Sequence, residues 1–220
     1  DVHALVHDVL GHERCLVAGG DIGGVVGVDL VHRFGDFVER FCFFNTVPPA
    51  AIEEYAAAGL DYGSLSALSD GRTGDYRELQ GARPDELAAM LPTDAARRQW
   101  IAGMYTSRLW ASPGTFGRAD LDFMTEPFAD EARLCAGWSA YQLGPGRPMT
   151  EPPLLAGTVD VPTLLLYGTD DHVVDDDFVM FCERAFTDRI GPLLIPGAGH
   201  FLQWERADIF NPLLISVFGS

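Results

Sequence analysis

Lysine is absent from the sequence, and positive charge of any kind is scarce. All fifteen basic residues are arginines, against 32 Asp and Glu residues, so the formal net charge at pH 7 is -17. A field of that sign repels phosphate groups. We therefore expect the protein to bind neither nucleic acid nor an anionic membrane surface.

Long apolar runs and closely spaced cysteines are also lacking. No stretch approaches the ~20 apolar residues that a membrane-spanning helix needs, and no basic start with an apolar middle marks a secretion signal. The four cysteines lie far apart and form no CxxC pair: Cys15, Cys42, Cys135 and Cys182. This spacing indicates neither a disulfide framework nor a zinc site. We expect a cytoplasmic protein with reduced, buried cysteines and no metal.

The 220 residues, of which 47% are hydrophobic, can form one well-packed domain, or one domain with an insertion. Short apolar runs predict buried strands at residues 14–18, 40–45, 163–167 and 191–195. Amphipathic spacing predicts helices at residues 1–10, 25–34, 176–186 and 207–218. Buried strands that alternate with helices are typical of an α/β fold with a mostly parallel sheet.

The middle of the chain has a different character. Residues 50–155 are rich in Ala, Arg and Glu, are interrupted by Gly and Pro, and contain no convincing buried strand. We interpret them as a helical insertion between two parts of the α/β core, residues 1–49 and 156–220.

The turn Gly19–Gly24 is the most informative segment. A strand that runs through small residues into a helix, with one polar side chain at the apex, has the pattern of a nucleophile elbow. We expect Gly19, Gly23 and Gly24 to leave room where the helix packs closely on its strand. The apex residue is Asp21. A dinucleotide-binding loop would need glycine there, and a purely structural glycine turn is the remaining alternative.

Two further polar residues follow predicted strands. Asp171 comes shortly after the apolar run 163–167, and His200 lies in a glycine-rich loop after the last strand. Open α/β sheets place functional side chains at the carboxyl ends of their strands. Taken alone, either Asp171 or its neighbour Asp170 could be a solvated loop carboxylate, and His200 an ordinary polar loop residue.

Together, Asp21, Asp171 and His200 form an ordered set. A carboxylate attacks amides poorly, but it is a competent nucleophile toward a strained or halogenated sp³ carbon and forms an ester with it. His200, oriented by Asp171, would then be the general base for the water that hydrolyses the ester. This chemistry needs neither a metal nor an organic cofactor.

Three segments resemble the elbow, acid and histidine motifs of the α/β-hydrolase superfamily, in its epoxide hydrolase and haloalkane dehalogenase branch: Gly19–Gly24, Gly168–Asp171 and Gly197–Phe201. The similarity extends over nearly the whole chain. It implies an α/β-hydrolase fold with a helical cap, Asp21 as nucleophile, Asp171 as charge partner and His200 as base. Asp170 is disfavoured, because the family's acid is usually the fourth residue of a G-x-x-D motif.

The resemblance also implies cap tyrosines that hydrogen-bond the epoxide oxygen and protonate the departing alkoxide. Tyr141, in residues 137–142, resembles the later of these, and Tyr76, in residues 74–80, resembles the earlier one more weakly. Tyr105 is the reserve candidate. Each of these tyrosines could instead pack between cap helices.

Departures from the family pattern bear on whether the substrate is an epoxide or a haloalkane. Many dehalogenases have Trp directly after the nucleophile, and fluoroacetate-type dehalogenases have Arg, whereas this chain has Ile22, which has no donor. Some dehalogenases take their acid from the segment after the second strand, but Asn45 and Thr46 offer none. These absences favour epoxide over halide chemistry.

The family normally has several strands before the helix with which this chain opens, and an HGxP loop that is absent here. The sequence resembles the second two-thirds of such an enzyme, with the N-terminal part of the sheet missing. We therefore expect an exposed sheet edge and association between copies, such as a homodimer.

The sequence thus predicts an epoxide hydrolase that opens small or medium apolar epoxides to vicinal diols with water. The alternatives are a haloalkane-type dehalogenase with the same triad and a catalytically silent hydrolase-fold protein or fragment. Aromatic residues of the insertion suggest an apolar substrate cavity, although they could equally form its core: Trp100, Tyr105, Trp110, Phe116, Phe123, Phe128 and Trp138.

Overall fold

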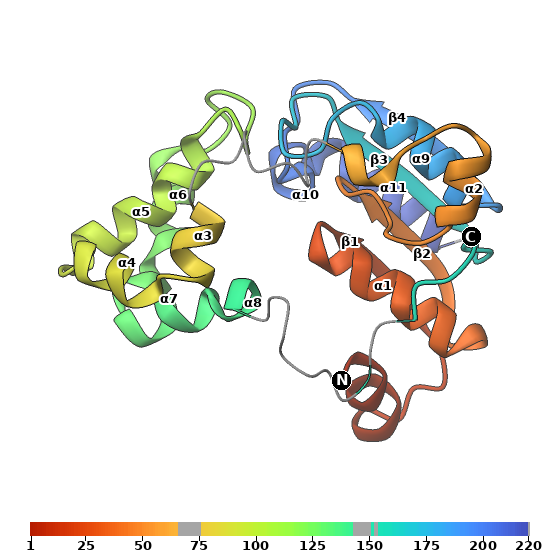
Figure 1. The fold of residues 1–220 in the computed structure, drawn as a ribbon, viewed down its shortest axis with the longest axis horizontal. Helices are drawn as coiled ribbons and strands as arrows, with labels where there is room; N and C mark the ends of the chain where they lie inside the picture. Colours follow the sequence, from red (N-terminus) through yellow and green to blue (C-terminus); the bar gives the residue numbers. More distant parts are fainter. Residues whose placement is uncertain (66–75, 143–150, 152–153, 220) are drawn as a thin grey trace. The chain divides into compact units, whose positions relative to one another are not determined.

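The computed structural model describes residues 1–65, 76–142, 151 and 154–219. The chain divides into two compact units (Figure 1). The core unit comprises Asp1–Leu68 and Pro152–Ser220, and the helical unit comprises Ser69–Glu151. Each unit has a hydrophobic core of its own.

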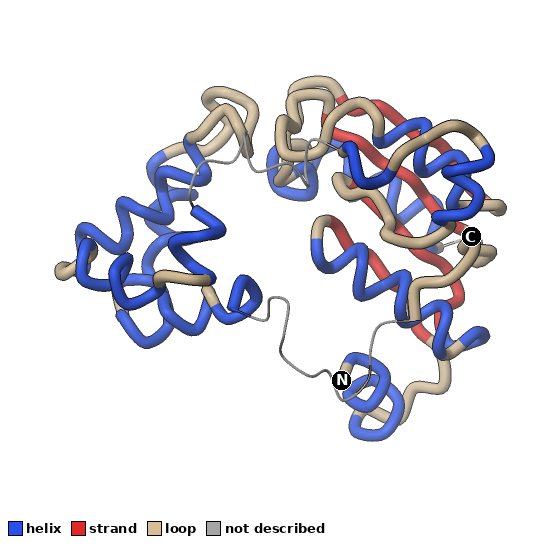
Figure 2. Tube along the Cα trace, in the orientation of Figure 1, coloured by secondary structure: helices blue, strands red, loops and turns tan. Residues whose placement is uncertain are grey.

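Strands occur in the core unit, and the described part of the helical unit contains helices and loops but no strand (Figure 2). The elements of the core unit are η1 (Ala4–Val9), β1 (Cys15–Gly20), α1 (Ile22–Arg33), η2 (Gly35–Phe37), β2 (Val38–Phe44), α2 (Ile52–Ala57), η3 (Tyr62–Ser64), β3 (Thr163–Gly168), α9 (Phe178–Ala185), β4 (Arg189–Ile195), α10 (Leu202–Glu205) and α11 (Ala207–Phe218). Those of the helical unit are α3 (Tyr76–Gly81), α4 (Pro84–Met90), α5 (Asp94–Thr106), α6 (Arg118–Thr125), η5 (Glu126–Ala129), α7 (Glu131–Gly137) and α8 (Ser139–Gln142).

The four strands of the described residues form one parallel sheet in the order β1-β2-β3-β4. The two central strands are apolar at successive positions because both of their faces are covered. On one face, Cys42 and Phe44 pack with α11, where the ring of Phe210 lies 5.2 Å from that of Phe44. On the other face, Phe41 and Phe43 contact Phe186 at the end of α9. The strand period of two thus builds a core on each side of β2.

All four strands run in the same direction, so their carboxyl ends lie at one edge of the sheet. Asp21 follows β1 directly, Asn45 follows β2, Asp171 comes three residues after β3, and His200 lies in the loop after β4. The topology therefore brings polar residues from four separate parts of the sequence to a single edge.

The helical unit packs around its own apolar cluster, formed by Leu87, Leu91, Ile101, Leu134 and Trp138. Arg97 is buried beside this cluster, and its guanidinium donates to the carbonyl oxygens of Leu91 and Ala129 at 3.1 and 2.7 Å. The arginine therefore supplies partners for two backbone carbonyls of the helical unit.

The predicted strands are confirmed, with no end shifted by more than two residues, and so is the prediction of a parallel α/β fold. The helix after the elbow begins at Ile22 and not at Val25, because it starts directly behind the apex residue. The closing helix over residues 207–218 is found as predicted.

The boundary expected at residue 50 is too early. Helix α2 and the turn η3 belong to the core unit, where the ring of Tyr55 lies 4.7 Å from that of Phe181 on α9. Tyr55 is buried, and its hydroxyl donates to the carbonyl of Pro48 at 3.0 Å. The helical unit begins at Ser69 and ends at Glu151.

The opening helix is shorter than expected and forms wide turns over Ala4–Val9, and Gly11 follows with a φ of 76°. Leu5 and Val9, on its expected apolar face, are exposed. Cys42 and Cys182 are buried, whereas Cys15 and Cys135 are partly exposed, and all four thiols are free. Among the described residues, no helix has the length and apolar character that crossing a membrane requires.

Candidate active site

Asp21 stands at the apex of a strained turn between β1 and α1. Its φ of 48° and ψ of -132° lie in a region that side chains rarely adopt. Such strain persists only where the surrounding structure enforces it, and it is typical of functional turns. The Asp21 side chain is 62% exposed, so its carboxylate is accessible from outside the core unit.

The glycines around Asp21 allow the turn to close, although not all in the expected way. A Cβ atom on Gly19 would lie 2.5 Å from the carbonyl oxygen of Gly23, and one on Gly24 would lie 2.7 Å from Cγ2 of Thr46. For Gly23 the prediction is wrong, because a Cβ atom there would meet nothing within 4 Å. The crowding at Gly23 comes from its backbone oxygen, which faces Gly19.

Asp171 is fully buried behind the end of β3. Its Oδ1 accepts hydrogen bonds from the backbone N–H groups of Val173 and Val174 at 2.8 and 3.1 Å. Its Oδ2 faces Nδ1 of His200 at 2.8 Å. The two backbone donors hold the carboxylate in place, which leaves the second oxygen directed at the imidazole.

His200 joins the two carboxylates. Its Nδ1 lies 2.8 Å from Asp171 and its Nε2 lies 3.0 Å from Oδ2 of Asp21, while only 5% of its side chain is exposed. The structure therefore brings Asp21, His200 and Asp171 into one hydrogen-bonded chain, in the arrangement of a nucleophile, a base and an orienting acid.

The electrostatic balance at His200 favours the imidazolium. Burial by itself disfavours that charge, but the hydrogen bonds to Asp171 and Asp21, together with their negative charges, raise the pKa of His200 to about 10. With both carboxylates ionised, the imidazole is therefore protonated near neutral pH and donates from both ring nitrogens.

Two polar residues that the sequence analysis did not select hold the histidine loop. Asn45 is fully buried and bonds to the loop and to Gly168, and Glu205 on α10 bonds to the loop from its other side. Asn45 directly follows a strand at the functional edge of the sheet, and that position was an available signal. Nothing in the local sequence pattern singles out Glu205.

Tyr76 and Tyr141 come together within the helical unit. Their rings pack edge to face with centroids 5.8 Å apart, and the ring of Trp110 lies 5.3 Å from that of Tyr76. Nε of Arg77 donates to the Tyr76 hydroxyl oxygen at 3.1 Å. Tyr105 contacts Phe116 instead, and burial raises its pKa. The role of these tyrosines toward Asp21 stays a prediction.

An apolar cavity of about 500 Å³ lies within the helical unit. Its wall includes Tyr76, Trp100, Met104, Leu109 and Trp110. The aromatic residues of this unit were expected to line a cavity or to form its core, and both occur. Trp138 lies in the core cluster, Trp110 lines the cavity, and Trp100 does both. A pocket of this size and lining suits the apolar body of a small molecule.

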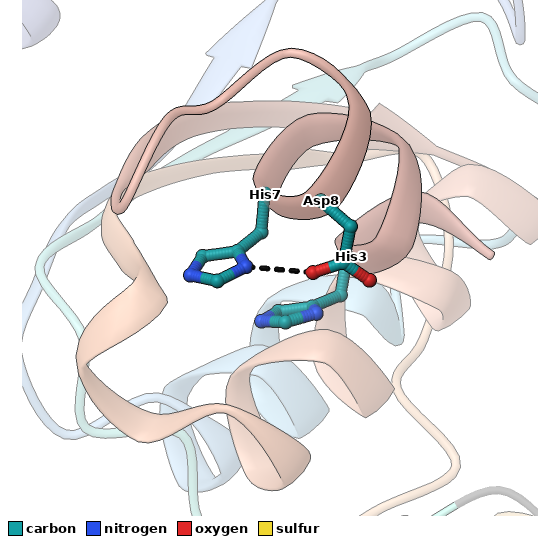
Figure 3. Close-up of side chains that lie close together, drawn as sticks. All are labelled: His3, His7 and Asp8. Atoms are coloured by element: carbon teal, nitrogen blue, oxygen red, sulfur yellow. Dashed lines mark hydrogen bonds and ion pairs between the residues drawn. The ribbon is translucent and has the colours of Figure 1, made fainter.

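A second group of polar side chains lies near the start of the chain (Figure 3). His3, His7 and Asp8 bring three potential ligand atoms within 4.8 Å of one another. Nδ1 of His7 is 2.8 Å from Oδ1 of Asp8, and the ring of His3 stacks on that of Phe34 with centroids 3.8 Å apart. These contacts already engage the side chains, so we assign the group no part in the chemistry.

Comparison with known proteins finds relatives in structure only. No family model matches the sequence, and no curated protein does. Among solved structures, the epoxide hydrolase CorEH is similar, with a TM-score of 0.73 and 17% identity over 97% of this chain and 71% of its own.

Two further epoxide hydrolases are similar to this chain. One is described among novel epoxide hydrolases from metagenomes of hot environments and has a TM-score of 0.69, 16% identity, and coverage of 97% of this chain and 70% of its own. The other, from Bacillus megaterium and solved with an inhibitor, has a TM-score of 0.64, 15% identity, and coverage of 99% of this chain and 73% of its own. Identities this low establish the architecture and not the reaction, and on that basis the chain has the α/β-hydrolase fold, as the motifs predicted.

Proposed function

We propose that this protein is an epoxide hydrolase, which opens an apolar epoxide to a vicinal diol through a covalent ester on Asp21. The observation that carries the proposal is the chain of hydrogen bonds from Asp21 through His200 to Asp171, at 3.0 and 2.8 Å. The nucleophile in this chain is a carboxylate, whose chemistry differs from that of a serine.

In the first step, a carboxylate oxygen of Asp21 attacks one carbon of the epoxide, and the bond from that carbon to the ring oxygen breaks. Relief of ring strain makes this displacement feasible for a weak nucleophile. The products are an alkyl ester of Asp21 and an alkoxide, which must gain a proton.

Tyr76 and Tyr141 are the proposed donors to that alkoxide. A phenol can stabilise the developing charge by hydrogen bonding without being ionised beforehand. Arg77 donates to the Tyr76 oxygen at 3.1 Å, which leaves the hydroxyl proton of Tyr76 for a ligand and would stabilise a transient phenolate. The apolar cavity beside Tyr76 supports an apolar substrate body.

Formation of the ester would convert His200 from an acid into a base. Esterification removes the negative charge of Asp21, one of the two carboxylates that raise the pKa of His200. The imidazolium can then give up its proton to the tyrosinate that remains after the alkoxide has been protonated, which restores the tyrosine. Neutral His200, with Nδ1–H directed at Asp171, can take a proton from water as that water attacks the ester carbonyl. The tetrahedral intermediate then collapses: the alkyl oxygen takes the proton from the imidazolium and leaves as the second hydroxyl of the diol, and the Asp21 carboxyl group returns its own proton to His200 and is restored as a carboxylate.

Halide displacement would use the same three residues, and Ile22 distinguishes the two reactions. An aliphatic side chain next to the nucleophile provides no N–H donor for a leaving halide. Epoxide opening has no such requirement, because its leaving oxygen can be met by the tyrosines.

The decisive experiment traps the ester. The change His200→Gln should allow attack and block hydrolysis, so incubation with an aryl epoxide should add the mass of the epoxide to the peptide that contains Asp21. The variant His172→Gln, changed at an exposed histidine of the core unit, serves as the matched control and should turn over without accumulating an adduct. An adduct with a haloalkane only would establish dehalogenation, and no adduct with either would indicate a silent fold.

The tyrosines need a separate test. Tyr76→Phe and Tyr141→Phe should each slow alkylation of Asp21 by about 100-fold or more, as expected for loss of a positioned proton donor. Tyr105→Phe should leave the rate unchanged. Equal rates in all three variants would remove the tyrosines from the mechanism and leave the role of Asp21 untouched.

A further inference from the structure

The loop that carries His200 lies between β4 and α10, and two side chains bind its backbone in addition to backbone hydrogen bonds such as that from the N–H of Asp170 to the carbonyl of Ala198. The side chain of Glu205, on α10, forms hydrogen bonds with the backbone of this loop. Its Oε2 accepts from the N–H of Gly199 and its Oε1 accepts from the N–H of Phe201, each at 3.0 Å. One carboxylate therefore binds the backbone on both sides of the histidine.

Asn45 holds the same loop from the end of β2. Its Nδ2 donates to the carbonyl oxygens of Gly199 and His200 at 2.7 and 3.1 Å. Its Oδ1 accepts from the N–H of Gly168, at the start of the turn that carries Asp171. Asn45 thus connects the loop that carries His200 to the turn that carries Asp171. Glu205, in contrast, accepts hydrogen bonds from the N–H groups of the His200 loop.

The chemistry of position 205 requires a carboxylate. Both of its partners are N–H donors, so both oxygens must accept, and an amide at this position would turn its own NH₂ group toward one of them. Glu205 is buried, and a buried anion is retained at low cost only where donors such as these compensate for lost water. The site is therefore built for a carboxylate and tolerates no amide without rearrangement.

We propose that Glu205 is a positioning residue for His200, which sets the imidazole at the distance and angle where it meets Asp21 and Asp171 together. Glu205 acts through the backbone of residues 199–201 and does not touch the substrate. This inference rests on the proposed function only for its catalytic consequence, since the placement of the imidazole can be measured without any substrate.

Two variants separate positioning from a simple effect of charge. Glu205→Gln removes one acceptor and one negative charge, whereas Glu205→Asp keeps the charge but withdraws the carboxylate by one methylene group. If Glu205 positions His200, both variants should move the imidazole from its carboxylate partners and lower its pKa. If its charge alone mattered, Glu205→Asp would leave the pKa unchanged.

The measurement is an NMR titration of the His200 ring in the full chain, with circular dichroism to verify folding. We expect a fall of at least one pKa unit, which is a tenfold change in proton affinity, for both variants. Glu183→Gln, at an exposed carboxylate of α9, is the control and should titrate like the wild type.

A kinetic measurement follows the same variants. Hydrolysis of the Asp21 ester, which uses His200, should slow about 10–100-fold, while formation of the ester should change by less than about twofold. An unchanged titration of Glu205→Asp would overturn the proposal even if that variant melted at a lower temperature. If no variant or wild type forms an adduct, the proposed function fails, and the titration still decides the role of Glu205.

Discussion

Asp21 and His200 follow the two outer strands of the sheet, yet Oδ2 of Asp21 and Nε2 of His200 are only 3.0 Å apart. The loop after β4 must therefore reach past the ends of β3 and β2 to meet the residue that follows β1. Asn45, at the end of β2, provides an attachment point along that path, and its Oδ1 accepts from the N–H of Gly168 at the end of β3.

Protonation of His200 should make stability depend on pH. The pKa of His200 is raised to about 10 in the folded protein, against an ordinary value of about 6.5. The folded state thus binds the proton more tightly, and this contribution is fully present below pH ~6.5 and lost as the pH rises toward ~10. We expect a loss of at most about 5 kcal/mol in the free energy of unfolding over that range.

Urea unfolding at several pH values checks this expectation, with His200→Gln as the reference because it removes the titrating group. The variant should be less stable than the wild type at pH 6, and the two should converge near pH 10. A constant difference between them at every pH would contradict the assignment.

The elbow should tolerate a methyl group at one glycine and not at its neighbour. In Gly24→Ala, the new Cβ would lie 2.7 Å from Thr46, inside contact distance, and we expect a loss of about 1–3 kcal/mol in stability. Gly23→Ala meets nothing within 4 Å and should change stability by less than about 1 kcal/mol. Chemical denaturation of the two variants side by side measures the difference, and equal losses would mean that the helix is not packed as closely as described.

Relief of the backbone strain at Asp21 should increase the free energy of unfolding. Its φ of 48° suits glycine better than a side chain. Asp21→Gly should therefore be more stable than Asp21→Asn by about 1 kcal/mol, because both variants lose the carboxylate and only glycine relieves the backbone. Both should fail to form the ester. Thermal unfolding compares them, and a less stable glycine variant would argue against strain at this position.

Arg97 should stabilise the helical unit. It donates to the carbonyls of Leu91 and Ala129 and to the exposed carboxylate of Asp94. Arg97→Ala leaves the two backbone carbonyls without these donors and should cost about 3 kcal/mol. The control Arg118→Ala removes a side chain that is 96% exposed, and should cost less than about 0.5 kcal/mol. Tryptophan fluorescence is a suitable probe of unfolding, since Trp138 is buried in this unit. Similar curves for both variants would show that the buried guanidinium is dispensable.

Copies of the chain should associate through exposed apolar surface near β1. Among the described strands, β1 is an outer one that pairs with β2, and Leu16 on it is 46% exposed, with Ile22 exposed nearby. Such an edge promotes pairing between molecules. Sedimentation velocity should show larger species as concentration rises, and Leu16→Lys should reduce them. Phe123→Lys, on an exposed residue of the helical unit, should have no effect, and a wild type that is monomeric throughout would refute the prediction.

The strands and the elbow could be predicted because their signals are local. The short apolar runs within residues 40–45 and 163–167 indicate strands covered on both faces. The glycines around Asp21 indicate a tight turn. The order of Asp21, Asp171 and His200 along the chain, each after a strand, was enough to predict their convergence, because parallel strands present their carboxyl ends at one edge.

Other features depend on contacts between segments that are distant in sequence. The local sequence does not indicate that Glu205 accepts hydrogen bonds from the N–H groups of Gly199 and Phe201. Helix α2 has the sequence character of the helical insertion, and only the packing of Tyr55 against Phe181 shows that it belongs to the core unit. Sequence by itself therefore determined the kinds of elements and the identity of the candidate triad, since periodicity and residue chemistry are carried by neighbouring residues. Tertiary structure decided which buried polar groups support that triad and where the helical unit begins, because hydrogen-bond partners and packing surfaces exist only once the chain has folded.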